Sequence, residues 1–115
     1  MIERIRTRDT FVRLRREGRR VRIEPLWCTY SIEPASDTAE VAFAINRAVG
    51  NAVVRNRLRR RLRAILSGLD VPHGSYLVGC RPAAAELTFD QLRGTTQRLV
   101  ERIAQRQAAV EVGDR

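Results

Sequence analysis

The central stretch of the chain, residues 50–67, reads GNAVVRNRLRRRLRAILS. Asn51 is a favourable N-cap and Gly68 ends the pattern, so the stretch predicts a helix from Ala52 to Ser67. At helical spacing its larger apolar side chains fall on one stripe, formed by Val54, Leu58, Leu62, Ile65 and Leu66. Other elements must cover such a stripe, so the stretch predicts a folded domain with this helix packed on its core.

Arginine occupies the remaining faces of this helix. Six arginines fall within residues 55–63, and residues 41–69 hold seven arginines without a single Asp or Glu. Like charges four residues apart destabilise a helix by roughly 0.2–0.5 kcal/mol per pair. An external polyanion would relieve this repulsion, because the arginine fork binds two phosphate oxygens and its flat face stacks on bases. A solvated charged face is the alternative, but such faces usually mix both signs.

The composition of the whole chain also favours an anionic partner. The 115 residues include 22 basic and 13 acidic side chains, giving a formal net charge of +9, and every basic residue is arginine. The length and the 43% hydrophobic fraction predict one domain over residues 1–115, frayed after about residue 109. Since neither a membrane-length apolar run nor a signal-peptide pattern is visible, we expect a cytoplasmic protein.

Nucleic acid is the expected partner, with RNA favoured over DNA because the helix lies in a compact domain without a zipper or helix-turn-helix partner. An anionic membrane surface is the alternative. It is the weaker one, because the apolar stripe of the helix is needed for the protein core. We therefore expect no membrane partner.

Hydrophobic alternation, turn residues and capping residues predict the other elements. They are a helix over residues 9–17 that ends at Gly18, strands over 21–32, 41–45 and 75–80, and a last helix from the Thr88–Gln91 capping box to about Gln107. Within residues 21–32, Pro25 indicates that the regular strand begins after the proline or lies at a sheet edge. In the first strand, Trp27 and Thr29 share one face and Cys28 lies on the other. The predicted order is α-β-β-α-β-α, an α+β sandwich of helices on one small sheet.

Residues suited to catalysis or metal binding are few and scattered. Cys28 and Cys80 lie in apolar stretches without a CxxC motif or a His neighbour, which predicts two buried, reduced thiols; a disulfide between neighbouring strands is the alternative. His73 lies in a Pro-His-Gly turn, and no paired carboxylates, nucleophile motif or phosphate-binding loop accompanies it. The chain thus presents neither a protein active site nor a metal site.

The arginine-rich helix resembles a family signature. Residues 50–57, GNAVVRNR, and residues 59–63, RRRLR, are similar to the signature helix of the bacterial ribonuclease P protein subunit. The resemblance covers nearly the whole chain. Phe11 and Gly18 correspond to the aromatic residue of the family's first helix and the glycine after it. Further similar segments are residues 41–49, 75–78 and 87–89.

The resemblance implies a fold and a function. The fold would contain a left-handed βαβ crossover, although such crossovers are right-handed as a rule. The protein would bind the catalytic ribonuclease P RNA and assist the endonucleolytic removal of the 5′ leader from precursor tRNA, without a protein partner. Mg²⁺ held mainly by the RNA would carry out the hydrolysis, in agreement with the lack of a protein active site. A structural RNA-binding or ribosomal-type protein with no role in tRNA processing is the alternative.

The resemblance also implies two RNA-binding sites. The family's arginine-rich helix contacts the catalytic RNA; in this sequence that surface consists of Arg47, Asn51, Arg55, Asn56, Arg57, Arg59, Arg60, Arg61 and Arg63. A cleft between the first helix and the sheet would hold the single-stranded leader. In this sequence the cleft would include Phe11, Arg15, Trp27 and Thr29.

The chain departs from the family pattern at three places. Arg15 stands where a second aromatic residue is common, and Thr29 stands where a tyrosine is often found. The pair Arg47–Ala48 keeps one of two basic residues. We hypothesise that Trp27 and Arg15 supply the lost stacking, since both have a face for a base. A role of Trp27 in covering the sheet is the alternative.

Overall fold

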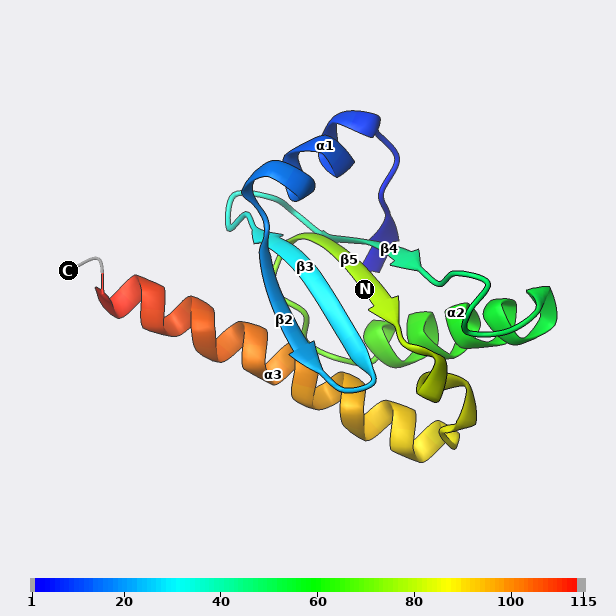
Figure 1. Ribbon diagram of the computed structural model, residues 1–115. Coiled ribbons are helices and arrows are strands. Elements are labelled where there is room, and N and C mark those ends of the chain that lie inside the picture. Colours follow the sequence, from blue (N-terminus) through cyan, green and yellow to red (C-terminus); the bar gives the residue numbers. More distant parts are fainter. Residues whose placement is uncertain (1, 114–115) are drawn as a thin grey trace.

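The computed structural model describes residues 2–113, which form a five-stranded mixed sheet with helices on both of its faces (Figure 1). In chain order the elements are β1 (Ile2–Arg4), α1 (Arg8–Glu17), β2 (Arg19–Ile23), β3 (Leu26–Ile32), β4 (Ala39–Ala44), α2 (Ala52–Ser67), β5 (Gly74–Cys80), the short 3₁₀ helix η1 (Pro82–Glu86) and α3 (Phe89–Gly113). The strand order is β1-β4-β5-β3-β2. β1, β4 and β5 run parallel, whereas β3 is antiparallel to both of its neighbours.

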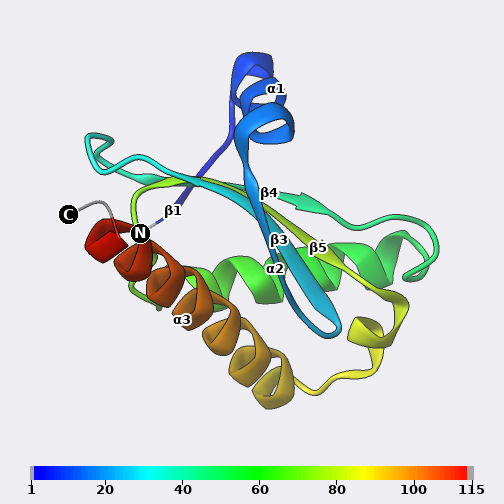
Figure 2. The same ribbon diagram turned by 60° about the vertical axis from the view of Figure 1, so that its left-hand side comes forward.

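Side chains alternate between a core face and a second, more open face of the sheet. On β3, Leu26, Cys28 and Tyr30 are buried, while Trp27 and Thr29 are half-buried on the opposite side. α2 and α3 cover the core face, and α1 lies over one end of the other face (Figures 1 and 2). We call the face that carries Trp27 and Thr29 the open face.

The helix predicted from Ala52 to Ser67 is confirmed at both ends. The Asn51 side-chain oxygen accepts a hydrogen bond from the Val54 backbone N–H at 3.0 Å, which caps the helix, and Gly68 follows its last turn. The predicted apolar stripe packs into the core: Leu58, Leu62, Ile65 and Leu66 are buried and Val54 is partly buried. Each leucine buried in this way contributes about 1.5–3 kcal/mol, which fixes the orientation of the arginines on the other faces.

The last helix begins as predicted and ends later than predicted. Thr88 and Gln91 form the capping box, with backbone-to-side-chain distances of 2.9 and 3.1 Å. α3 continues to Gly113, beyond the predicted end near Gln107, and the frayed tail expected after about residue 109 stays a prediction. No Gly or Pro interrupts the sequence between residues 95 and 112. Residues 114–115 lie outside the described part of the chain.

The strand predicted over residues 21–32 begins after Pro25, as the proline indicated, at Leu26; the residues before Pro25 belong to a second strand, β2, so the segment contains most of a hairpin. β2 and β3 pair antiparallel, with Val21 opposite Cys28, and the chain reverses at Glu24 and Pro25. Proline has no N–H to donate to a strand ladder, so a regular strand cannot run through Pro25 unchanged. The hairpin starts at Arg19, earlier than the hydrophobic alternation suggested.

The N-terminal strand β1 was also not predicted. Its three residues pair parallel with β4, with Ile2 opposite Ala39 and Arg4 opposite Val41. Three residues are too few to show an alternating pattern, so only the neighbouring strand defines this element. The element order is therefore β-α-β-β-β-α-β-α, and the α+β class is confirmed. The β4–α2–β5 unit is a parallel crossover, and the left hand implied by the resemblance stays a prediction.

Candidate nucleic-acid interface

The sequence-predicted RNA surface lies on the side of α2 that faces away from the core. Arg57 and Arg60 are exposed, as is Arg47 in the turn before the helix. The other four arginines are half-buried: Arg55, Arg59, Arg61 and Arg63. Within residues 2–113, none of these arginines has a carboxylate within ion-pair distance. The positive charge of α2 is therefore not neutralised by the described part of the chain.

The two asparagines of this surface have structural partners in the protein. The Asn51 side-chain oxygen is used as the N-cap of α2. The Asn56 side-chain oxygen accepts a hydrogen bond from Nη1 of Arg59 at 2.9 Å, which holds that guanidinium beside the helix. Both amide NH₂ groups retain donor capacity. The structure therefore gives each asparagine a positioning role in addition to any contact with RNA.

A groove lies between α2 and the β1–β4 edge of the sheet. It has a volume of about 590 Å³, and its apolar floor includes Val41 and Phe43 of β4. The remaining lining residues are Arg4, Ile5, Ala42, Asn56, Arg59, Arg60 and Arg63. We call it the arginine groove. It combines four guanidinium groups with an aromatic ring, a composition suited to phosphates and bases together.

Arg63 is the cation of the arginine groove that lies over an aromatic ring. Its Cζ atom lies 5.2 Å from the centroid of the Phe43 ring, a cation–π geometry. Burial lowers the pKa of Arg63, and the positive charge of Arg4 lowers it further. The protein thus holds two like charges together in a partly desolvated groove, and a bound anion would relieve the repulsion. Arg4 was missed by sequence reasoning, since nothing predicted that β1 lies beside β4.

The second predicted site lies on the open face. Trp27 lies against Gly79 of β5, and a Cβ atom at Gly79 would overlap the indole ring. The Arg20 guanidinium lies over the same indole, 4.4 Å from the ring centroid. Trp27 therefore covers the sheet, which was the alternative to a stacking role, and Arg20 lies over Trp27. Arg20 was not among the predicted site residues.

The helix α1 forms one side of this second site. Leu14 and Thr10 are its buried side chains, and Gly18 at its end comes so close to Thr29 that a Cβ at Gly18 would overlap the Thr29 methyl group. Thr29 is therefore in contact with the end of α1. Phe11 is half-buried and Arg15 is exposed, four positions apart on one side of the helix.

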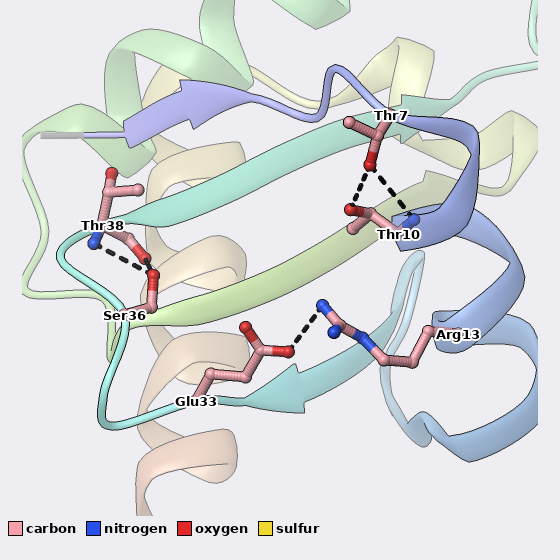
Figure 3. Close-up of polar contacts among 6 residues, drawn as sticks. All are labelled: Thr7, Thr10, Arg13, Glu33, Ser36 and Thr38. Atoms are coloured by element: carbon pink, nitrogen blue, oxygen red, sulfur yellow. Dashed lines mark hydrogen bonds and ion pairs between the residues drawn. The ribbon is translucent and has the colours of Figure 1, made fainter.

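Polar contacts fasten α1 to the rest of the fold (Figure 3). Thr7 caps the helix by accepting the Thr10 backbone N–H at 3.3 Å. Arg13 reaches from α1 to Glu33, just after β3, with Nη2 2.6 Å from the carboxylate oxygen. This pair is partly exposed, so it contributes no more than about 1 kcal/mol. It lies on the side of the helix opposite Arg15 and leaves that arginine free for a ligand.

The two sites are connected along the surface. A second groove of about 370 Å³ is lined by Trp27, Ala44, Ile45, Asn46 and Cys80. It shares Phe43 and Arg59 with the arginine groove. A path of aromatic and basic side chains therefore leads from the open face to α2, around the carboxyl ends of β4 and β5.

Other features of the described chain offer no further chemistry at this surface. Cys28 and Cys80 are buried, as predicted, and the structure joins neither of them in a disulfide. His73 is exposed in its turn, with Nδ1 2.7 Å from the Ser36 carbonyl oxygen. Among residues 2–113, no three His, Cys, Asp or Glu side chains come together as metal ligands. No helix in this range is both long and apolar enough to span a bilayer.

Known proteins share both the sequence and the fold of this chain. The family model described as Ribonuclease P matches residues 2–104. The chain is 33% identical to the ribonuclease P protein component of Roseiflexus castenholzii, over 93% of this chain and 90% of that protein. It is 37% identical to that of Acidothermus cellulolyticus, over 89% and 88%. The similarity to the Thermus scotoductus protein reaches 46% identity, but over 51% of this chain and 36% of that protein.

Solved structures show the same architecture. The RNase P protein from Thermotoga maritima has a TM-score of 0.76 and 25% identity, over 87% of this chain and 96% of that one. The Staphylococcus aureus RNase P protein has a TM-score of 0.75 and 22% identity, over 88% and 94%, which is a likeness of fold. The predicted resemblance is confirmed.

Proposed function

The chain belongs to the ribonuclease P protein family, and we propose that it binds the catalytic RNA of that enzyme through α2 and the arginine groove. The observation that carries this proposal is the charge on α2. Its arginines have no ion-pair partner within residues 2–113, and its apolar stripe is buried in the protein core. The negative charge that pairs with these arginines must then come from another molecule, and the phosphates of RNA supply it.

The proposed reaction is the endonucleolytic removal of the 5′ leader of precursor tRNA. We assign the chemistry to the RNA and a binding role to the protein, because the described residues form a basic surface rather than a set of acid, base and nucleophile. Mg²⁺ belongs to the same proposal as an ion held mainly by the RNA. In this proposal the protein supplies no Mg²⁺ ligand of its own; among residues 2–113 no three His, Cys, Asp or Glu side chains come together.

The open face is the proposed site for the leader. It carries Trp27, Thr29 and the overlying Arg20, and α1 borders it with Phe11 and Arg15. Aromatic and guanidinium faces bind single-stranded bases with little sequence preference. Because the second groove links this face to the arginine groove, one protein can hold the leader while it contacts the catalytic RNA.

Leader release at low Mg²⁺ tests the proposal. Catalytic RNA and precursor tRNA are mixed with and without the protein, and the 5′ leader is separated and quantified. We expect the protein to raise the cleavage rate, because its arginines neutralise phosphates that Mg²⁺ would otherwise screen. Binding to the catalytic RNA without any rate increase would favour the alternative of a structural RNA-binding protein.

A further inference from the structure

The indole of Trp27 is covered on both of its faces. Its inner face lies on Gly79, whose lack of a side chain makes room for the ring. Its outer face lies under the Arg20 guanidinium at 4.4 Å. The Arg20 guanidinium therefore occupies the position from which a base would stack on the outer face of the indole. The group above Trp27 that a ligand meets first is the Arg20 guanidinium.

Arg20 is well placed to contact a ligand on the open face. It lies on the edge strand β2 with an exposed side chain, and no carboxylate in residues 2–113 forms an ion pair with it. Its backbone is fixed from the other side of the sheet, since Nη1 of Arg106 donates a hydrogen bond to the Arg20 carbonyl oxygen at 2.9 Å. The indole beneath and the anchored strand restrict the guanidinium before any ligand arrives, which lowers the entropy cost of binding.

We propose that a base of the single-stranded 5′ leader stacks on the outer face of the Arg20 guanidinium, with Trp27 as its support. This inference rests on the proposed function and names the residue that contacts the leader. The guanidinium plane would lie between base and indole, while its N–H groups remain available to phosphate oxygens at the rim. Every base has a π face, so the contact would accept leaders of any sequence.

Charge favours RNA as the occupant of this position. Arg20 and Arg22 both lie on the open face of β2, where they pair in register with Thr29 and Trp27. The nearby Glu24 is engaged by Arg22 and Arg81, each at 3.7 Å. The groove that starts at Trp27 continues to Arg59 rather than to an acidic region. A strand of linked phosphates therefore meets arginines at both ends of the path, Arg20 and Arg22 on β2 and Arg59 on α2.

Substitution of Arg20 separates the planar contact from simple charge. Arg20→Lys keeps the positive charge but has no planar face, and Arg20→Ala removes both. Affinity is measured for holoenzymes with each variant, using precursor tRNA with a leader of several nucleotides and one with a single leader nucleotide. We expect both variants to lose about tenfold in affinity for the long leader and to change little for the short one. Arg98→Lys on α3 is the matched control and should retain the wild-type preference.

Two results would overturn the inference. If Arg20→Lys retains the long-leader preference, the contact is one of charge and not of stacking. If Arg20→Ala binds the long leader as tightly as the wild type or more tightly, the base contacts Trp27 directly and Arg20 only obstructs it. Thermal unfolding of each variant confirms that the fold is intact, which we expect because the side chain is exposed on an edge strand.

Fluorescence supplies a readout that does not depend on cleavage. Trp27 is the only tryptophan of the chain, so its emission reports this position alone. Addition of a single-stranded RNA with the leader sequence should change the emission of the wild type, and Arg20→Lys should need a higher RNA concentration for the same change. An unchanged emission at saturating RNA would place the leader elsewhere.

The cleavage assay keeps the two proposals distinguishable. If the wild type does not stimulate leader release, the proposed function fails. If the wild type stimulates it and Arg20→Lys behaves identically with every leader length, only the role of Arg20 fails.

Discussion

The Arg63 guanidinium on α2 lies over the ring of Phe43 on β4, with its Cζ atom 5.2 Å from the ring centroid. Arg4 on β1 lines the same groove. Burial lowers the pKa of Arg63, and repulsion from the positive charge of Arg4 lowers it further. The N-terminal strand β1 thus joins the consecutive elements β4 and α2 in one basic surface. RNA that contacts α2 at this groove also contacts the sheet.

The exposed arginines of α2 should contribute more to RNA binding than those of α3. Arg57→Ala with Arg60→Ala should lower affinity for the catalytic RNA by about tenfold or more and reduce the salt slope by about 2, since each removes a phosphate contact. Arg98→Ala with Arg102→Ala removes the same charge from another helix and should have a smaller effect. Filter binding or fluorescence anisotropy at several salt concentrations measures both. Equal losses for the two double variants would mean that only the net charge matters.

The salt dependence of the wild type tests how many arginines are used at once. If about five to seven arginines neutralise phosphates, log K for the catalytic RNA should fall with log[salt] with a slope of roughly −4 to −6. The measurement is a titration at constant Mg²⁺ over a range of monovalent salt. A slope near −1 would show that most of these side chains remain in solvent.

The sequence predicted the elements that carry their own local signals. Asn51 and Gly68 mark the two ends of α2, and the spacing of the apolar residues from Val54 to Leu66 defines its buried side. The side of the helix on which the arginines lie could therefore be predicted. Pro25 indicated where the regular strand begins, but the hairpin of β2 with β3 was missed because hydrophobic alternation continues on both sides of the proline. Local patterns define helix faces, but they do not reveal where a chain reverses if both strands share the same alternation.

The partners of the site residues depend on strand pairing, which the sequence does not display. Arg4 reaches the arginine groove only because β1 pairs with β4, and Trp27 meets Gly79 only because β3 and β5 are adjacent. Arg20 lies over Trp27 across the β2–β3 hairpin. Each of these contacts joins residues whose separation in the chain gives no periodic signal, so sequence reasoning found the arginines of one helix and not the neighbours that orient them.

Alkaline pH should destabilise the fold, because two buried thiols and a buried tyrosine hydroxyl lose their protons. Burial raises the pKa of the Cys80 thiol from 9.0 to about 11, and burial also raises the pKa of Cys28 and of Tyr76. The folded state holds these protons more tightly than the unfolded state. The free energy of unfolding should therefore be constant below pH 9 and fall as the pH rises toward 11, by about 1.4 kcal/mol per pKa unit of difference.

Denaturant unfolding at a series of pH values measures this effect. Cys80→Ala should reduce the fall between pH 9 and 11, whatever its effect on stability at neutral pH, because one of the titrating groups is gone. In the native protein at neutral pH, both thiols should also react slowly with a thiol reagent, since little thiolate is present. A wild-type stability that rises over this pH range would contradict the predicted sign.

Two glycines should respond in opposite directions to the same substitution. At Gly79 a Cβ would overlap the Trp27 indole, whereas at Gly94, in α3, no atom lies within 4 Å of the position of the added carbon. Gly79→Ala should therefore displace the indole, remove its support for Arg20 and cost about 1–3 kcal/mol. Gly94→Ala should stabilise the protein by about 1 kcal/mol, because alanine favours a helix interior over glycine.

Trp27 emission and thermal unfolding together decide the case. Gly79→Ala should shift the emission to longer wavelength as the ring moves into solvent, with a lower midpoint of unfolding. Gly94→Ala should leave the emission unchanged and raise the midpoint. If Gly79→Ala kept both the wild-type emission and the wild-type midpoint, the indole would not rest on the sheet at Gly79, and the support for a base-stacking guanidinium at Arg20 would be lost with it.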